Sequence, residues 1–361
     1  MGLVLPAQPG YVVEENLDEL AELARSTGMD VVGRSLQSRR APDARTLIGR
    51  GKVEEIARAA DELHADVVIF DDDLTPNQVR NLEETIKCAV IDRSGLILDL
   101  FVRQARTREA RTQVELAQLE YQLPRLTRRW THLSRQAGGI GVRGGEGETQ
   151  LEADRRMVRT RIKQLKKELS KIEQTRKLHR RGRRDVPIIA FAGYTNAGKS
   201  TLFNRFTHAG VRAENRLFAT LDPRLRKGSL GGTRTAVFAD TVGFIRKLPH
   251  HLVASFRSTL EEITQADIVL HVIDRSHPRW REQMEVGETV LADIGVDMSL
   301  VLPVFNKMDL WGAPGSDGPE PGGANDALAV SAQTGAGVEE LRAHLLEQLN
   351  GSGAGGNRTG A

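Results

Sequence analysis

Residues 186–201 read VPIIAFAGYTNAGKST, and this stretch decides the fold of the second half of the chain. An apolar run leads into GYTNAGKS, which fits a phosphate-binding loop when a strand precedes it and a helix follows it. Its glycines let several backbone N–H groups converge on one anion at a helix N-terminus. We predict that Lys199 reaches the β- and γ-phosphates and that the Ser200 hydroxyl binds Mg²⁺. The stretch therefore predicts a protein that binds a nucleoside triphosphate.

A second motif, DTVGF at residues 240–244, follows a strand predicted at 235–240. An aspartate at this place in a phosphate-loop protein can hold Mg²⁺ through water, and this assigns Asp240 to the metal. Gly243 lets the backbone N–H approach the γ-phosphate without a side-chain clash. We therefore expect this segment to respond to the third phosphate.

Two later motifs indicate which base is bound. The sequence NKMD, residues 306–309, follows another predicted strand. The Asp309 carboxylate can accept two parallel N–H bonds from guanine, a pairing that adenine cannot supply. Asn306 can tie this loop to the phosphate loop, and the Lys307 stem can lie along the base. The SA dipeptide at 331–332 can offer a backbone N–H to guanine O6. In this order, the motifs predict GTP.

Composition bounds the class of protein. A chain of 361 residues, 27% charged and 39% hydrophobic, is expected to form two or three globular domains. Cys88 is the single cysteine, so no disulfide can form within the chain and a reducing compartment fits. The N-terminus lacks the features of a signal peptide, and no apolar run reaches the length of a membrane span. The pair His250-His251 is read as a helix start and not as a zinc site.

Positive charge is concentrated in the middle of the chain. Residues 102–184 hold 23 Lys or Arg against 9 Asp or Glu, a net charge of +14, which leaves −11 for the rest. Such segregation points to nucleic acid or another polyanion. The basic run 176–184 and a glycine-rich stretch that carries Arg143 are either linkers or phosphate contacts, and we favour contacts.

The same middle segment has a heptad period. Apolar residues recur every three or four positions in 116–133 and in 158–172, with the glycine-rich stretch 138–147 between them. Two such helices joined by a flexible loop predict an antiparallel coiled-coil hairpin. Two amphipathic helices packed on a neighbouring domain would give the same period. Pro124 interrupts the first seam and either kinks that helix or marks its start.

On both sides of the hairpin, strands alternate with helices. This favours a small N-terminal α/β unit and, from residue 186, a doubly wound, mostly parallel sheet of the P-loop NTPase type. In the first unit, strands are predicted at 31–32, 66–70 and 89–92, and helices at 52–63, at 75–87 with Thr75 as N-cap and Pro76 at its first position, and near Leu96. Residues 311–325 and 351–361 are predicted to be disordered. The predicted domains are the N-terminal α/β domain 1–108, the basic hairpin with its Gly-rich tip 109–184, the GTP-binding domain 185–350 and the tail 351–361.

The motifs together resemble those of translation-factor-related GTPases. Longer stretches resemble the HflX family: IGRGK, ELAQLEYQLPRL, GGIGVRGGEGETQLEADRR, LFATLDPRLRKGSL and DTVGFIRKLPHHLVASFRSTLEE. The likeness covers nearly the whole chain. It implies a cytoplasmic GTPase that uses Mg²⁺ and associates with the large ribosomal subunit and ribosomal RNA. Some members split ribosomes, and some are reported to use ATP as well.

The resemblance also implies roles for single residues. Thr220, in FATLD, matches a switch threonine that senses Mg²⁺ and the γ-phosphate. Many members read DPTTR where this chain reads DPRLR at 222–226, which leaves open whether a hydroxyl contact exists there. The predicted catalytic residues are Lys199, Thr220 and Gly243, and the predicted metal ligands are Ser200, Thr220 and Asp240. The predicted nucleotide-binding residues are Gly193, Tyr194, Thr195, Asn196, Ala197, Gly198, Lys199, Ser200, Thr201, Phe218, Ala219, Thr220, Asp240, Thr241, Val242, Gly243, Asn306, Lys307, Asp309, Ser331 and Ala332.

Phe244 stands where Ras-like GTPases place a glutamine that orients the attacking water. Phenylalanine can neither accept nor donate a hydrogen bond. We therefore expect slow intrinsic hydrolysis of GTP until a partner orders the switches or supplies a polar group.

These features favour a ribosome-stimulated GTPase that splits or recycles stalled ribosomes. The alternative is a GTP-gated RNA-binding or ribosome-tethering factor without splitting activity. A third reading places an ATP-related site at the Gly-x-Gly-Lys of residues 49–52. We expect a cytoplasmic monomer without a membrane span and without DNA as a partner, and leave peripheral membrane association open.

Overall fold

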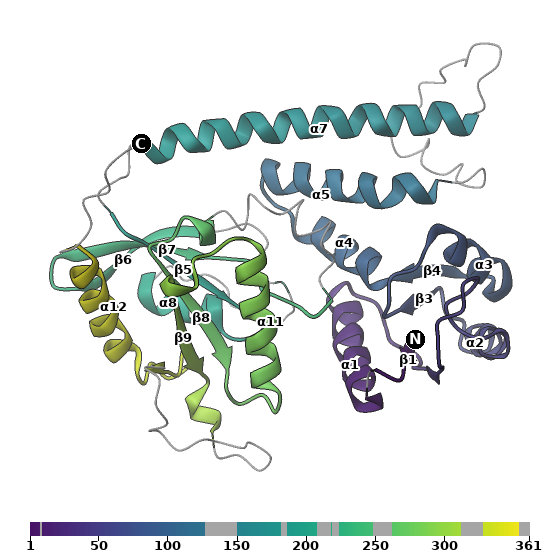
Figure 1. Cartoon of the computed structure of the whole chain (residues 1–361), viewed down its shortest axis with the longest axis horizontal. Coiled ribbons are helices and arrows are strands. Elements are labelled where there is room, and N and C mark those ends of the chain that lie inside the picture. Colours follow the sequence, from purple (N-terminus) through teal and green to yellow (C-terminus); the bar gives the residue numbers. More distant parts are fainter. Residues whose placement is uncertain are drawn as a thin grey trace. The chain divides into compact units, whose positions relative to one another are not determined.

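The computed structural model describes residues 1–7, 9–126, 150–181, 186–207, 218, 224–247, 262–311 and 328–353. The chain divides into two compact units, Met1–Ile172 and Glu173–Ala361. Each unit is taken by itself below, and Figure 1 labels their elements. Within the described ranges, no helix carries an apolar stretch of the length needed to cross a bilayer.

The first unit is built on short parallel strands. Its elements are β1 (Gly2–Val4), α1 (Gly10–Ser26), β2 (Leu36–Ser38), α2 (Arg50–Glu62), β3 (Val67–Phe70), α3 (Pro76–Ile86), β4 (Ala89–Asp92), α4 (Arg93–Gln104), α5 (Arg108–Gln122), the 3₁₀ turn η1 (Leu123–Arg125) and the part of α7 (Gln150–Arg181) up to Ile172. Strand β1 pairs with β2, and β3 pairs with β4, both in parallel. Two hydrogen bonds of Met1 join the pairs: its amino group donates to the Ile69 carbonyl (2.7 Å), and its carbonyl accepts from the Asp71 N–H (2.9 Å).

Most predicted elements of this unit are confirmed. Strand β4 has the predicted bounds, and Thr75 closes a capping box with Gln78 at the start of α3. The strand predicted at 31–32 is wrong, because these residues pair with no other strand and the strand forms later, at β2. Strand β1 was not predicted. Both β1 and β2 have only three residues, too few to show a period.

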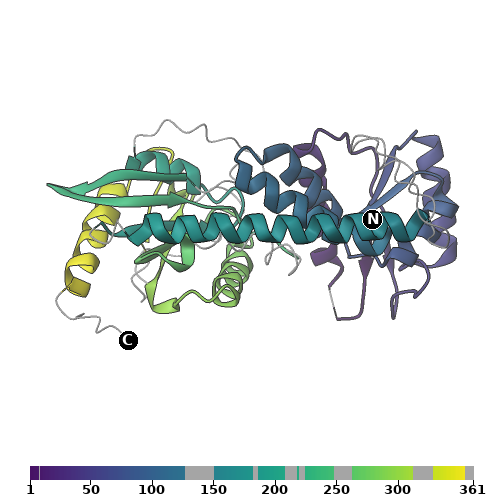
Figure 2. The same ribbon diagram turned by 90° about the horizontal axis from the view of Figure 1, so that it is seen from above.

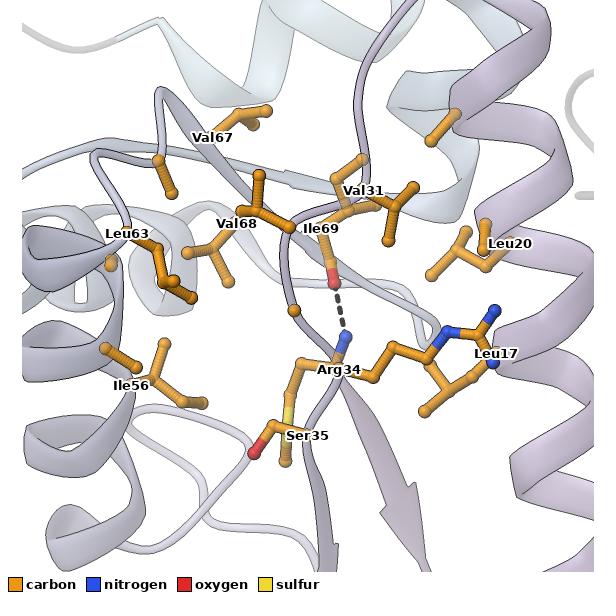
Figure 3. A pocket seen from close by; sticks show the side chains of 18 of the residues that line it. Leu17, Leu20, Val31, Arg34, Ser35, Ile56, Leu63, Val67, Val68 and Ile69 are labelled. Carbon is orange, nitrogen blue, oxygen red and sulfur yellow. Dashed lines mark hydrogen bonds between the residues drawn. The ribbon is translucent and has the colours of Figure 1, made fainter.

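An apolar cavity of about 270 Å³ lies in the first unit, between α1, α2, β3 and residues 29–35. Figure 3 shows Leu17 and Leu20 of α1 facing Ile56 of α2 across it, and the dashed hydrogen bond ends on the Ile69 carbonyl. At its rim, Val32 is 54% exposed and Leu63 is 49% exposed. Its lining is dominated by aliphatic side chains, which suits no phosphate group.

Helices α5 and α7 run antiparallel and lie side by side in both views (Figures 1 and 2). Ion pairs join Arg108 to Glu168 and Glu115 to Arg161, so the start of α5 faces the later part of α7. Helix α5 ends at Gln122, directly before the turn that contains Pro124. Residues 127–149, including the Gly-rich tip, lie outside the described residues. The antiparallel pair is therefore observed, whereas the coiled coil stays a prediction.

The second unit holds a six-stranded sheet. Its elements are β5 (Ile188–Gly193), α8 (Lys199–Thr207), β6 (Arg224–Gly231), β7 (Arg234–Asp240), β8 (Ile268–Asp274), α11 (Trp280–Asp293), η2 (Met298–Leu300), β9 (Val301–Asn306), η3 (Met308–Leu310), β10 (Leu328–Ala329) and α12 (Val338–Gly353). The strand order is β10-β9-β8-β5-β7-β6, and every neighbouring pair is parallel except β6 with β7. The predicted doubly wound, mostly parallel sheet is confirmed.

Alternating residues of β5 explain why both faces of this sheet are covered. Ile189 and Phe191 belong to one buried cluster, with side chains of α8 and α12. Ala190 and Ala192 belong to another, with Leu291 of α11. The near-continuous apolar run predicted this, because a strand buried on both faces has no polar side. Helix α12 extends through Gly353, three residues into the predicted tail; residues 312–327 and 354–361 lie outside the described residues.

Candidate nucleotide-binding site

The phosphate loop connects β5 to α8, as predicted. Its backbone is left-handed at Gly193 (φ 139°), Asn196 (φ 62°) and Gly198 (φ 96°). A Cβ atom at Gly193 would lie 2.2 Å from the Val272 carbonyl oxygen, and one at Gly198 would lie 2.1 Å from Nδ2 of Asn306. Both glycines are therefore required by contact as well as by conformation.

Lys199, the first residue of α8, is buried with only 6% of its surface exposed. Its ammonium donates to the carbonyls of Gly193 (3.0 Å) and Tyr194 (2.7 Å). Burial lowers the pKa of Lys199 to about 8, and the nearby Asp240 carboxylate opposes that shift. A buried cation at the N-terminus of a helix is suited to a polyanionic ligand.

Two of the three oxygen ligands predicted for the metal, Ser200 and Asp240, lie next to each other. The Ser200 hydroxyl lies 2.8 Å from Oδ2 of Asp240, which ends β7 and is fully buried. A hydroxyl and a carboxylate are the hard oxygen donors that Mg²⁺ prefers alongside phosphate oxygens and water, so the residues present fit the ion. The third predicted ligand, Thr220, lies outside the described residues, as does Ala219. The described residues contain no group of three or more His, Cys, Asp or Glu that could hold a metal by itself.

The segment after β7 is docked on the phosphate loop. The Phe244 N–H donates to the Gly193 carbonyl (2.9 Å), and the Phe244 carbonyl accepts from the Thr195 N–H (2.8 Å). Tyr194 and Phe244 thus form a parallel bridge, and the Tyr194 hydroxyl accepts from the Arg246 N–H (2.9 Å). The ring of Phe244 is 1% exposed and packs in the apolar cluster beneath α11. Its side chain therefore faces the core.

The other residues of this segment are buried too. A Cβ atom at Gly243 would lie 2.8 Å from Cγ2 of Thr195 and 3.0 Å from the Lys199 ammonium, so only glycine fits there. The Thr241 hydroxyl donates to the Phe191 carbonyl (2.6 Å), and Val242 is buried. This close contact places the segment where it can respond to a phosphate that Lys199 binds.

The base-reading loop is held by Asn306, which is 1% exposed. Its Nδ2 donates to the Ala197 carbonyl (2.8 Å), and its Oδ1 accepts from the Ala332 N–H (2.9 Å). The side chain thus ties the loop after β9 to the phosphate loop, as predicted, and also to the segment after β10. The Ser331 hydroxyl donates to Oδ1 of Asp309, which brings the carboxylate expected to read guanine beside the SA dipeptide.

Two features of this site were not predicted from the sequence: one ion pair and one buried histidine. The Lys307 ammonium donates to Oδ2 of Asp274 (2.6 Å), the last residue of β8. Asp274 comes directly after an apolar run, and this position could have indicated that it belongs to the site. Below the loop, burial and the Lys199 charge lower the pKa of His271 to about 4, so this histidine is neutral at ordinary pH.

The structure brings most of the predicted residues together at the carboxyl ends of β5, β7, β9 and β10. Those residues are Gly193, Tyr194, Thr195, Asn196, Ala197, Gly198, Lys199, Ser200, Thr201, Asp240, Thr241, Val242, Gly243, Asn306, Lys307, Asp309, Ser331 and Ala332. Phe218 is the single described residue in 208–223 and is buried.

The Gly-x-Gly-Lys of residues 49–52 has a different geometry. Gly49 caps α2, and its N–H donates to Oε1 of Gln37 (2.8 Å). Lys52 lies within the helix and pairs with Glu55. These four residues form an ordinary helix start, without the left-handed turns of the loop before α8.

Some of the basic side chains of α7 form contacts within the chain, and others are exposed. Arg161 and Lys166 pair with acidic residues of α5, and Arg155 donates to the Leu126 carbonyl (3.1 Å). Arg159 and Lys163 are exposed. The helix therefore offers some positive charge to a partner while other cations hold it to α5.

Three family models match the chain in sequence. They are described as GTP-binding GTPase N-terminal (residues 14–102), GTP-binding GTPase Middle Region (104–183) and 50S ribosome-binding GTPase (188–307). A relative named GTPase HflX from Magnetococcus marinus is 50% identical over 91% of this chain and 76% of its own length. GTPase HflX from Escherichia coli is 49% identical over 93% of this chain and 80% of its own length.

Among solved structures, one similar protein is a GTP-binding protein from Sulfolobus solfataricus in complex with GDP. It is 24% identical, with a TM-score of 0.47 over 96% of each chain.

Proposed function

The chain belongs to the HflX family of GTPases, and we propose that it hydrolyses GTP with Mg²⁺ on the large ribosomal subunit and thereby splits or recycles stalled ribosomes. Binding and hydrolysis of GTP follow from the family. The observation that carries the choice of nucleotide is the tie made by Asn306, because it holds Asp309 and Ala332 at fixed places beside the phosphate loop. A guanine N1–H and N2–H can then reach the Asp309 carboxylate while O6 meets a backbone N–H.

In the proposed reaction, the loop before α8 binds the phosphates through its backbone N–H groups, and Lys199 stabilises their charge. Ser200, Asp240 and Thr220 would hold Mg²⁺, which neutralises charge on the β- and γ-phosphates when bound. Gly243 lets the second switch approach the γ-phosphate without a side chain in between. The chain's own contribution is therefore positioning and electrostatics.

The burial of Phe244 supports the prediction that intrinsic hydrolysis is slow. Its ring is packed in the core and could not orient water even if it were polar. We propose that ribosomal subunits stimulate the reaction by ordering the switches or by supplying a polar group. A partner that positions the water and stabilises charge can contribute several kcal/mol to such a barrier.

Two observations support a ribosomal partner. The family model over 188–307 is described as a ribosome-binding GTPase, and the segment 102–184 carries a net charge of +14. We propose that exposed cations of α7 contact ribosomal RNA. Reversing the charges of Arg159 and Lys163 should weaken binding to large subunits and flatten its dependence on salt. The matched control reverses Arg50 and Arg80, which are exposed on α2 and α3. Equal loss in both pairs would contradict a specific role for α7.

The alternative is a GTP-gated RNA-binding or tethering factor that leaves ribosomes intact. Sucrose-gradient profiles separate the two functions. Splitting predicts that whole ribosomes incubated with the chain and GTP turn into subunits, whereas tethering predicts whole ribosomes that carry the chain.

A further inference from the structure

Thr195, the third residue of the phosphate loop, has a buried hydroxyl that the described residues leave without a hydrogen-bond partner. The residue is 6% exposed. Leaving a buried hydroxyl without a hydrogen bond lowers the free energy of unfolding by about 1–3 kcal/mol. Such a group in a binding loop therefore suggests a partner that is present only when the ligand is bound. The backbone N–H of the same residue is engaged by the Phe244 carbonyl.

Thr195 lies close to two other residues that are expected to meet the γ-phosphate. A Cβ atom built at Gly243 would lie 2.8 Å from Cγ2 of Thr195 and 3.0 Å from the Lys199 ammonium. Thr195 and the Lys199 ammonium therefore both lie beside Gly243, the glycine expected to approach the γ-phosphate. Rotation about χ1 exchanges the methyl and hydroxyl groups of threonine among staggered positions, while its Cβ stays fixed.

The neighbouring hydroxyl groups already have hydrogen-bond partners. The Ser200 hydroxyl is bonded to Asp240, and the Thr241 hydroxyl points into the sheet toward the Phe191 carbonyl. Phe244 occupies the place of a water-orienting glutamine, but its ring is in the core. Thr195 is thus the hydroxyl next to both Gly243 and Lys199 that the described contacts leave available.

We propose that the Thr195 hydroxyl positions the attacking water against the γ-phosphate, an inference that rests on GTP hydrolysis at this site. The water oxygen forms a bond to the γ-phosphorus as the bond from that phosphorus to the β–γ bridging oxygen breaks. The bridging oxygen leaves with the electron pair on GDP, and the water proton ends on the released phosphate. Thr195 accepts a hydrogen bond from the water and carries no net proton.

Two substitutions separate the hydroxyl from the methyl group. Thr195→Val keeps the shape and removes the hydroxyl, whereas Thr195→Ser keeps the hydroxyl and removes the methyl. In single-turnover assays on the full chain, Thr195→Val should lower the rate constant of GTP hydrolysis about tenfold, the worth of one neutral hydrogen bond. Thr195→Ser should stay within about twofold of the parent, and affinity for GDP should be unchanged in both.

Thr207→Val is the matched control, because that hydroxyl donates to the Phe203 carbonyl within α8. An unchanged or faster rate in Thr195→Val would overturn the inference, and so would equal losses in Thr195→Val and Thr195→Ser, which would assign the effect to packing. If Thr195→Val loses affinity for GDP, Thr195→Ala, which fills less space, repeats the comparison. A parent chain that binds GTP without hydrolysing it would contradict the proposed function instead.

Discussion

Single residues decide how this site binds its ligand. Asn306 acts as a rigid spacer, since both ends of its amide are bonded to backbone groups from other segments. Gly198 can approach it only because it has no Cβ. The residue types of the phosphate loop were therefore predictable from the sequence. The tie to Asn306 was predicted as well, but the close contact of Gly193 with the Val272 carbonyl was not, because a sequence pattern does not show which backbone atoms of a neighbouring strand meet the loop.

Asp309→Asn tests the assignment of the base. An amide donates a hydrogen bond where guanine N1 and N2 also donate, so affinity for GTP should fall by about tenfold or more. Affinity for xanthosine triphosphate, which offers an oxygen in place of the N2 amino group, should rise. Competition binding against a labelled nucleotide measures both. Parallel losses for the two nucleotides would instead indicate a damaged loop.

The buried ammonium of Lys199 predicts how nucleotide binding depends on pH. Its pKa is about 8 in the protein without ligand, and bound phosphates should raise it. Binding then requires proton uptake once the pH exceeds 8, so affinity for GDP should be constant below that pH and fall as the pH rises above it. Titrations between about pH 7 and pH 9 measure the slope, and Lys199→Met should remove it. A flat profile in the parent would contradict the role of burial.

Among the helices and strands, the sequence predicted those that have a clear apolar pattern or an N-cap residue. The N-cap Thr75 of α3 and the apolar run of β5 are examples. Strand β6 was missed because RLRKGSLG holds few apolar residues. Such a composition is expected of an edge strand, where exposed charges discourage pairing with another chain. The docking of Phe244 on Gly193 was also not predictable, since it depends on backbone hydrogen bonds between segments 50 residues apart.

His271 makes the packing of β8 against α11 sensitive to acid. A Cβ atom at Gly287 of α11 would lie 2.4 Å from its Nε2, so the ring fills the space between the two elements. Its pKa is lowered from 6.5 to about 4 by burial first and by Lys199 second. The unfolded chain therefore binds the proton more readily, and this contribution to stability is complete above pH 6.5 and is lost as the pH falls toward 4.

His271→Leu should reduce that loss of unfolding free energy between the two pH values by up to about 3 kcal/mol. Urea unfolding of the parent and the variant at both pH values gives the difference. Carboxylates also titrate in this range, so only the difference between the two proteins is informative. Parallel pH profiles would exclude the histidine as the sensitive group.

A buried network fastens α5 to the strands of the first unit. The Asp92 carboxylate, which is fully buried, accepts from the N–H groups of Leu74 (3.0 Å) and Gly95 (2.9 Å). It also accepts from the Tyr121 hydroxyl (2.7 Å) and from Arg125 (2.9 Å). Both helical residues reach back to the end of β4, so the helical part is anchored by charge as well as by apolar contact.

Arg125→Met should therefore lower the free energy of unfolding by about 3 kcal/mol, because a buried carboxylate loses its cation. Arg80→Met, at an exposed cation of α3, should change it by less than about 0.5 kcal/mol. Urea unfolding of both full-length variants measures these differences. Similar effects at the two positions would show that the network does not anchor α5.

For the whole molecule, the sequence predicts the domains and the family, whereas the structure shows which side chains contact one another. The sequence indicated a GTP-binding domain, a basic middle segment and the family to which the chain belongs. The structure adds that Asn306 bonds to the phosphate loop and that the ring of Phe244 is turned into the core. We infer a ribosomal partner from the family model over residues 188–307, from the charge of residues 102–184 and from the missing water-orienting side chain.

The most direct test of this account is the rate of GTP hydrolysis by the full chain as purified large ribosomal subunits are added, at a low and a high salt concentration. We expect slow GTP hydrolysis by the chain alone and a rate that rises to saturation as subunits are added. The rise should be weaker at high salt, because salt screens the contacts with phosphates. Equal turnover with and without subunits at both salt concentrations would contradict it.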